Sequence, residues 1–241
     1  MKWSERLTRS GDGFDVQLPR SLVAERRDNI AILSLARPQK RNAIDDPTVL
    51  GIEAFFVALP DAIKAVVIAG EGDHFCSGLD LTELTERDTA QGIAHSRSWH
   101  RAFEHIEFGK APVVAVLHGA VVGGGGSVRL PRLIGTARMT DMMLTGRVYD
   151  AGEGQAIGIS HYLVAPGAGL AKGIELARCI AGNAPMTNFA VTHVLPRIAQ
   201  SDPASGYVTE ALISAIAQGN DEAKARLKAF LEKRAPKTVR N

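Results

Sequence analysis

The sequence contains little cysteine: Cys76 and Cys179 are the two thiols among 241 residues. They lie far apart and no C-x-x-C spacing is present, so the sequence favours neither a disulfide framework nor a structural zinc site. We therefore predict that the protein holds no metal. Unpaired thiols are typical of a reducing compartment, so we expect the protein in the cytoplasm.

Long apolar runs are absent as well. No stretch of the chain approaches the roughly 18 to 20 apolar residues that a membrane span requires, and residues 1–6 lack the apolar core of a signal peptide. Apolar residues make up 45% of the chain and are spread along it, which is typical of a soluble globular protein. We predict no membrane partner.

A strong excess of one charge is also missing. Lys and Arg together number 28 and Asp and Glu 26, which gives a net charge of +2. Proteins that bind nucleic acid concentrate positive charge on one face or along one helix, whereas the basic residues here are scattered except at the C-terminus. We therefore predict no nucleic-acid partner.

The first half of the chain contains a repeated alternation of strand and helix patterns. Apolar segments with strand composition occupy residues 30–35, 65–69 and 113–117. After the first of them, Asp45 or Asp46 before Pro47 supplies a cap and a first-turn proline for a helix. Short strands alternating with longer helices indicate an α/β fold. The polar N-terminal stretch, residues 1–28, is expected to form an arm or an edge hairpin.

The second half of the chain is mainly helical in pattern, and residues 160–164 are its one good strand candidate. Helical patterns cover residues 137–144, 153–158, 170–181, 188–198, 204–217 and 221–233, separated by Gly and Pro breaks. We therefore expect an α/β core over residues 1–136 and a mainly helical region over residues 137–241.

The run of four glycines at residues 123–126 is the most informative local feature. Consecutive residues without a β-carbon let the backbone approach a ligand closely and direct N–H groups toward it. The run matches neither a phosphate-binding P-loop nor a dinucleotide fingerprint, and Pro131 is expected to interrupt any helix that starts at the glycines. The pattern predicts a backbone site for an anion, but not for a nucleotide of those two kinds.

A second glycine-containing loop, residues 74–81, also follows a buried strand pattern. Two backbone N–H groups from separate loops can converge on one oxygen and stabilise the negative charge that develops on it, which is the arrangement of an oxyanion hole. The spacing alone favours the simpler alternative, two tight turns between strand and helix. Both interpretations are compatible with the residues taken singly.

The combination of these stretches resembles the crotonase family, the enoyl-CoA hydratase/isomerase superfamily. The matching segments are residues 35–44, 66–81, 110–125, 129–135, 143–146 and 230–234, and they are distributed over most of the chain after residue 28. The resemblance implies a spiral of strand–strand–helix (ββα) units followed by a helical C-terminal region that mediates trimer formation. It implies a homotrimer or a dimer of trimers.

The resemblance also implies roles for individual residues. The backbone N–H groups of Ser77 and Gly124 would form the oxyanion hole for the thioester carbonyl of an acyl-CoA. Residues that would contact coenzyme A are Lys40, Arg41, Gly78, Leu79, Asp80, Phe230 and Lys233. Cations complement phosphates, and an aromatic ring complements a base. The acyl-CoA would be the substrate, with no permanently bound cofactor.

The chain departs from the family pattern directly after the glycines. In the family these glycines open a helix with the first catalytic glutamate, and a later Pro-Glu segment carries the second. Here Ser127 occupies the first position, and residues 128–133 resemble family sequence beyond the second glutamate. We expect the core to be shorter by about one unit at residues 123–127, with reduced stability or altered assembly. Asp141 and Glu153, the nearest acids downstream, are expected to be ordinary helix residues.

The activity that the resemblance implies is that of an enoyl-CoA hydratase, which adds water to a 2-enoyl-CoA through an enolate held in the oxyanion hole. Hydration needs one group to deprotonate water and another to protonate the α-carbon, work that paired carboxylates do well. An isomerase, hydrolase or lyase of the same superfamily is an alternative. So is a homologue that binds CoA but is catalytically impaired.

Overall fold

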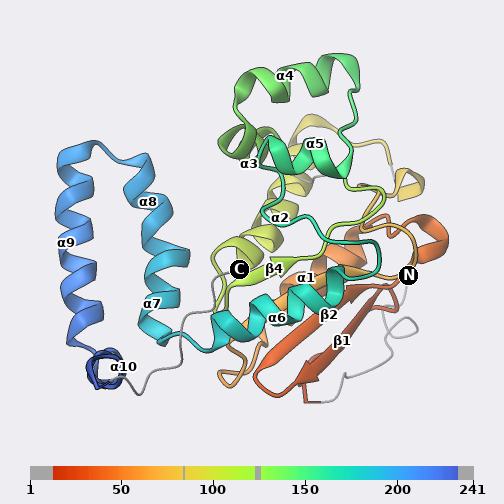
Figure 1. The fold of residues 1–241 in the computed structure, drawn as a ribbon. Coiled ribbons are helices and arrows are strands. Elements are labelled where there is room, and N and C mark those ends of the chain that lie inside the picture. The colour runs from red at the N-terminus through yellow and green to blue at the C-terminus, as the bar shows by residue number, and fades with distance from the viewer. Residues whose placement is uncertain (1–12, 84, 123–125, 233–241) are drawn as a thin grey trace.

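A four-stranded sheet forms the centre of the protein in the computed structural model, which describes residues 13–83, 85–122 and 126–232 (Figure 1). The strand order is β1-β2-β3-β4. β1 (Leu22–Arg27) pairs antiparallel with β2 (Ile30–Leu35), whereas β3 (Ala65–Gly70) and β4 (Val113–Ala115) join in parallel. Three of these strands were predicted, and the α/β class is confirmed.

The N-terminal stretch contributes the edge hairpin. Leu22 and Ala24 of β1 are buried while Val23 and Glu25 are exposed. This alternation is typical of a strand with one face toward the core and the other toward solvent. The hairpin turns at Asp28, whose φ of 58° lies in the left-handed region. β2 and β3 are instead apolar almost throughout and buried, as parallel strands covered on both faces are.

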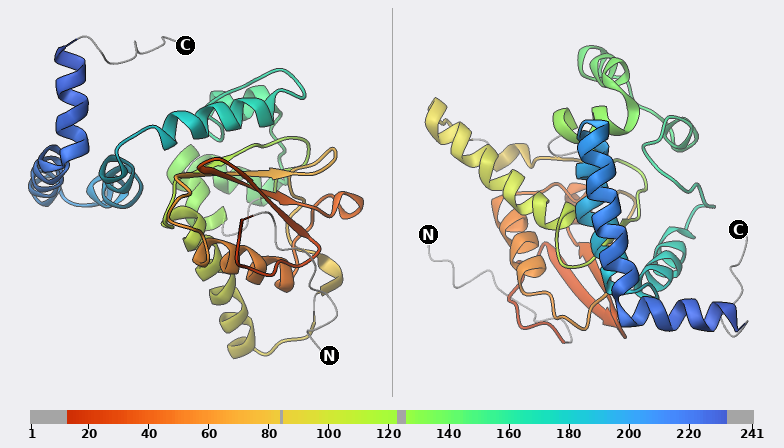
Figure 2. Two further views of the ribbon diagram at one scale, coloured as in Figure 1. Left: turned by 90° about the horizontal axis from the view of Figure 1, so that it is seen from below. Right: turned by 90° about the vertical axis from the view of Figure 1, so that its left-hand side faces the viewer.

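Helices cover both faces of the sheet (Figure 2). α1 (Asp46–Val57) and α2 (Thr89–Glu107) pack on one face, where Phe55, Phe56 and Leu33 lie in the larger apolar core. α6 (Gly169–Ala181) covers the other face and brings Ile174 against a smaller core around β2 and β3. The sheet therefore lies between two helical layers.

The start of α1 follows from local signals. Asp45 is its cap, because its carboxylate accepts a hydrogen bond of 2.9 Å from the Thr48 N–H, and Pro47 lies in the first turn. This confirms the predicted cap. Two short 3₁₀ turns, η2 (Pro38–Lys40) and η3 (Leu81–Glu83), stand in the loops after β2 and β3.

A group of three helices follows β4 and stands beside the sheet (Figure 1). These are α3 (Gly126–Ile134), α4 (Thr136–Thr145) and α5 (Ala151–Ala156). The expectation that Pro131 would interrupt a helix starting at the glycines is wrong, because α3 begins at Gly126 and contains Pro131. The proline lies in the second turn, so the helix lacks a single backbone hydrogen bond near its start.

The strand expected at residues 160–164 is also wrong. These residues form an irregular connection between α5 and α6, and Tyr162, Leu163 and Val164 are exposed. A strand needs a neighbour with which to exchange backbone hydrogen bonds. The sheet of the described residues ends at β4, so this segment finds none.

The C-terminal helices extend away from the sheet as an arm, residues 185–231 (Figures 1 and 2). They are α7 (Pro185–Phe189), the π-helical stretch η4 (Ala190–Val194), α8 (Leu195–Gln200), α9 (Pro203–Gly219) and α10 (Asp221–Leu231). The single helix expected at residues 188–198 is divided. Pro196 has no N–H for an α-helical hydrogen bond, and the backbone before it forms the wider hydrogen-bonded turns of a π-helix, η4. Within the described residues, none of the helices is long and apolar enough to cross a membrane.

Candidate functional site

Two loops leave the carboxyl ends of the neighbouring parallel strands β3 and β4 and run side by side. The Phe75 N–H donates to the His118 carbonyl at 2.8 Å, and the Cys76 N–H donates to the Ala120 carbonyl at 3.0 Å. The Val122 N–H returns a bond of 2.9 Å to the Cys76 carbonyl. Ligands of α/β proteins commonly bind at this end of the strands. The pairing brings residues 75–78 to the segment that leads into the glycine run.

The turn after β2 lies on the other side of the β3 loop. Ile44 N–H donates to the Gly78 carbonyl and Asp80 N–H to the Ile44 carbonyl, both at 2.8 Å. Ser77 N–H donates to the Arg41 carbonyl at 3.0 Å. The β3 loop is thus the middle of three paired segments.

These pairings decide which backbone N–H groups are free. Ser77, expected in the oxyanion hole, has its N–H bonded to Arg41, and Gly124, the other expected donor, lies outside the described residues. The N–H of Leu79 has no hydrogen-bond partner among the described residues. Because Asp80 directs its N–H to Ile44, and successive amides of an extended chain point to opposite sides, the Leu79 N–H points toward the β4 loop. Of these two amides, only that of Leu79 is left without a hydrogen bond within the described residues.

Gly78 allows the two loops to approach. Its φ is +91°, and a Cβ built there would lie 2.9 Å from the Val122 side chain. A larger residue would strain the backbone and push Val122 away. Gly78 was expected beside coenzyme A; the structure places it between the loops, next to Leu79.

Asp80 is a buried anchor of the β3 loop. Its carboxylate accepts from Arg37 Nη2 at 2.7 Å, from Lys40 Nζ at 2.8 Å and from the Thr82 hydroxyl at 2.7 Å. These hydrogen bonds, that of Lys40 first, hold the pKa of Asp80 well below its usual range. Asp80 remains an anion at every ordinary pH and ties the loop to the turn after β2.

The two basic residues expected near the CoA phosphates differ in their surroundings. Lys40 is bound to Asp80, although its side chain is 42% exposed. Arg41 is exposed, and its guanidinium has no ion-pair partner in the described part of the chain. Arg41 is therefore the more available cation, and Lys40 is shared with the loop.

The buried side chain of Asn42 anchors the β3 loop through hydrogen bonds to its backbone. The sequence reasoning did not identify this residue. It is 1% exposed. Its Oδ1 accepts from the Arg37 N–H at 2.9 Å, and its Nδ2 donates to the carbonyls of Glu71 at 2.9 Å and His74 at 2.6 Å. Its φ of 55° is one that Asn tolerates better than most residues. An Asn directly after a basic turn was the available signal.

The acids downstream of the glycines have ordinary structural roles, as expected. Glu153 accepts from Arg147 at 3.0 Å and forms a capping box with Asp150 at the start of α5. Asp141 lies 3.9 Å from the Arg147 guanidinium. Ser127 is an exposed residue in the first turn of α3. Across the described ranges, no group of three or more His, Cys, Asp and Glu side chains is arranged to hold a metal ion.

The structure does not bring Phe230 to the other expected site residues. Phe230 lies on α10 and is 69% exposed. Figure 1 shows α10 at the end of the arm, remote from the sheet of the same chain. Lys233 lies outside the described residues.

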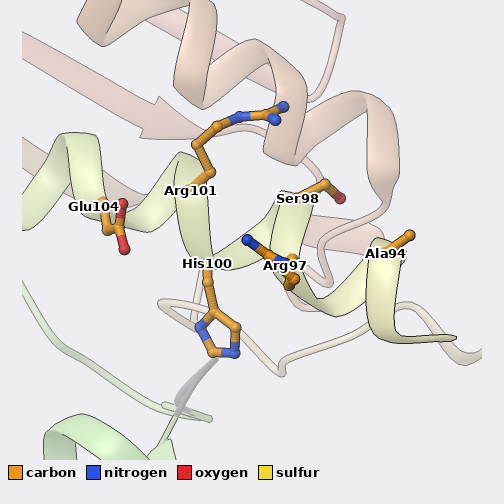
Figure 3. Close-up of a pocket in the computed structure, with 6 residues that line it drawn as sticks. All are labelled: Ala94, Arg97, Ser98, His100, Arg101 and Glu104. Atoms are coloured by element: carbon orange, nitrogen blue, oxygen red, sulfur yellow. The ribbon is translucent and has the colours of Figure 1, made fainter. Parts of the chain in front are cut away.

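A hollow of about 570 Å³ lies along α2 and contains none of the expected site residues. Its lining is drawn in Figure 3: Ala94, Arg97, Ser98, His100, Arg101 and Glu104. All come from one helix, and Arg101 binds Glu53 of α1 at 2.7 Å. The hollow is a concavity of the helix surface, whereas the candidate site is at the paired loops.

Comparison with known proteins identifies the family. The model of the enoyl-CoA hydratase/isomerase family matches residues 25–130. A Thermus thermophilus protein named "Putative enoyl-CoA hydratase" is 28% identical, over 90% of this chain and 100% of its own length.

Solved structures agree with this result. The crystal structure of a "putative enoyl-CoA hydratase" from Rhodopseudomonas palustris is 44% identical, with a TM-score of 0.85 over 88% of this chain and 95% of that one. A Thermobifida fusca protein of the same description, solved in complex with CoA, is 21% identical with a TM-score of 0.75 over 88% and 95%. The second likeness shows the fold. On the 44% identity and the matched family model, the chain belongs to the enoyl-CoA hydratase/isomerase family and has the crotonase fold.

Proposed function

We propose that the protein binds an acyl-CoA thioester at the paired loops after β3 and β4 and polarises its carbonyl with backbone N–H groups. The observation that carries this proposal is the Leu79 N–H, which has no partner among the described residues and points toward the β4 loop. The second donor is proposed from the glycine run after Val122, where Gly124 was expected. Donors fixed in this way stabilise the enolate oxygen, and removing one typically costs about 3–4 kcal/mol of barrier.

Cations near the turn after β2 suit the phosphates of coenzyme A. Arg41 is exposed and unpaired among the described residues, and Lys40 reaches the same turn while bonded to Asp80. Guanidinium and ammonium groups form charge-assisted hydrogen bonds with phosphate oxygens. The Thermobifida fusca structure holds CoA, which supports a CoA thioester as the substrate here.

The reaction we propose is the addition of water to a 2-enoyl-CoA. A titration with crotonyl-CoA tests it directly: saturable binding should lower the stretching frequency of the thioester carbonyl, and turnover should remove the absorbance of the conjugated enoyl group. Binding without a carbonyl shift would contradict the oxyanion hole.

A second candidate is a CoA-binding homologue without turnover. Ser127 stands where the family's first glutamate is expected, and Glu153 is bonded to Arg147 and the α5 cap. A serine hydroxyl is a far weaker base than a carboxylate. Crotonyl-CoA binding with a carbonyl shift but no turnover would select this candidate, and hydration at ordinary enzyme rates would eliminate it.

We propose that the protein is a homotrimer or a dimer of trimers in the cytoplasm. Val208, Leu212 and Ile216 recur on one stripe of α9, and each is more than half exposed. The exposed thiol of Cys179 is unpaired, which suits a reducing compartment. Sedimentation equilibrium tests the assembly, and a monomer at micromolar concentration would contradict it.

A further inference from the structure

His74 lies on the β3 loop, the middle of the three paired segments, and bonds to the other two. Its backbone carbonyl accepts the 2.6 Å hydrogen bond from Asn42 of the turn after β2. Its ring Nδ1 accepts a hydrogen bond of 3.0 Å from the Ala120 N–H of the β4 loop. No other described side chain bonds to the β4 loop backbone between residues 118 and 122.

We propose that His74 is a positioning residue that holds residues 119–122 in register against the β3 loop, and that its Nδ1 must be unprotonated to do so. The proposal rests on the proposed function, because residues 119–122 lead to the glycines that would supply the second carbonyl donor. His74 itself would touch no substrate.

The close packing at Gly119 supports this role. A Cβ built on Gly119 would lie 2.0 Å from the Asp73 carbonyl oxygen and 2.6 Å from His74 Nδ1. The backbone at residues 119–120 therefore packs closely against the His74 ring, with no room for a side chain at position 119. Both backbone groups of Ala120 are hydrogen-bonded, since its carbonyl accepts from Cys76 N–H at 3.0 Å while its N–H donates to His74.

Protonation would break this bond. A backbone N–H can only donate, so the ring nitrogen that faces it carries a lone pair, and the ring proton of neutral His74 is on Nε2. A proton on Nδ1 would make it a donor that faces the Ala120 N–H, which is also a donor, so no hydrogen bond could form between them. Acid that places a proton on Nδ1 should therefore release the β4 loop.

The titratable groups near His74 do not account for the expected release of the β4 loop by acid. The charged or titratable residues on the segments that contact His74 are Glu71, Asp73, Cys76 and Asp80 on its own loop, His118 on the β4 loop, and Arg37, Lys40, Arg41 and Asp45 at the turn after β2. Among the described residues none of these binds the His74 ring. His118 donates through Nε2 to the Gly72 carbonyl at 3.0 Å, a bond that survives protonation of its other nitrogen.

Two substitutions of His74 distinguish the effect of losing the hydrogen bond to Ala120 from the effect of protonating the side chain. His74→Asn places an amide oxygen near the position of Nδ1 and does not titrate, whereas His74→Leu removes the acceptor at similar bulk. Exposed His161, which has no described partner, supplies the control His161→Asn. Each protein is titrated with acetoacetyl-CoA by calorimetry between pH 5 and 8, and exchange of the Ala120 amide is followed by NMR without ligand.

In the parent protein, acetoacetyl-CoA affinity and Ala120 amide protection should fall together on acidification, in a one-proton step that His161→Asn retains. His74→Asn should abolish the step and keep neutral-pH affinity within about threefold of the parent. His74→Leu should weaken binding and protection by about tenfold at every pH, the ratio that one hydrogen bond sustains.

A protected Ala120 amide in His74→Leu would overturn the proposal, and so would an acidic step that persists in His74→Asn. If His74→Leu does not fold, the pH dependence of Ala120 exchange in the parent and in His74→Asn decides. If no protein binds acetoacetyl-CoA while Ala120 exchange responds as described, the proposed function fails and the positioning role of His74 stands.

Discussion

The loops around the sheet and the C-terminal arm are built in opposite ways. At the loops, polar groups such as Asn42 and Asp80 are buried and bonded within the chain. In the arm, α7, η4 and α8 bury no residue, and α9 buries only Gly206, while its Tyr207, Val208, Leu212 and Ile216 are exposed. The geometry of the candidate site is thus fixed within one chain, whereas the arm leaves apolar side chains exposed that the proposed assembly would cover.

The largest difference in unfolding free energy between the loops and the arm is expected for the loss of a buried amide, at Asn42. Asn42→Ala leaves the carbonyls of Glu71 and His74 and the N–H of Arg37 without their partner in a buried place, and should cost about 3 kcal/mol or more of unfolding free energy. The arm supplies the control: half-buried Asn188, which donates to the Ile180 carbonyl at 2.9 Å, should cost about 1 kcal/mol as Asn188→Ala. Equal losses in urea unfolding would remove the contrast.

The next effect concerns the free amide of the β3 loop. Leu79→Pro deletes the N–H, and Leu79→Ala keeps it. We expect the proline variant to lose on the order of 100-fold in turnover, or the carbonyl shift of bound crotonyl-CoA where turnover is absent. The alanine variant should keep the shift, and circular dichroism should show that both fold. A proline variant with an unchanged carbonyl frequency would assign the donor elsewhere.

The ion pairs of Asp80 should make stability depend on pH. A carboxyl group whose pKa is lowered by folding stabilises the protein above its unfolded pKa, about 3.9, and this stabilisation is lost as the pH falls toward the folded value. Asp80→Asn should therefore cost on the order of 2 kcal/mol at pH 7, and the difference from the parent should shrink below about pH 4. Asp61→Asn, at a carboxylate that is 94% exposed, should cost little at either pH. A pH-independent difference for Asp80→Asn would contradict the assignment.

The smallest effect is expected at Leu212, in a comparison that sharpens the contrast within apolar residues. Ile174→Ala on α6 opens a cavity beside β2 and β3 and should cost about 2–4 kcal/mol. Leu212→Ala on α9, where the side chain is 61% exposed, should change monomer stability by less than about 0.5 kcal/mol. The same Leu212 variant should weaken self-association in sedimentation equilibrium. A destabilised monomer with unchanged association would show that α9 packs within its own chain.

Much of the fold follows from local signals in the sequence. β2 and β3 are continuous apolar runs, and the Asp45 cap with Pro47 marks the start of α1. The strand expected at residues 160–164 failed because pairing depends on a neighbour that composition does not reveal. Whether residues 1–136 and 137–241 are separate units stays a prediction, although α6 of the second part packs on the sheet of the first.

The candidate site was located by its glycines and its family resemblance, but its hydrogen bonds were not. Ser77 and Leu79 are two residues apart, and only the pairing of Leu79 with Ile44 determines which amide is free. Asp80 was expected beside coenzyme A, whereas its carboxylate binds Arg37, 43 residues earlier in the chain. Such long-range partners have no signature in the local pattern.

Gly119 limits how far this chain can diversify. A substitution there must displace the Asp73 carbonyl and the His74 ring at once, and neither is the free end of a flexible side chain. In a library randomised at single positions and selected for folded protein, position 119 should return glycine almost exclusively. Position 121, whose Val side chain is 43% exposed, should accept many residue types.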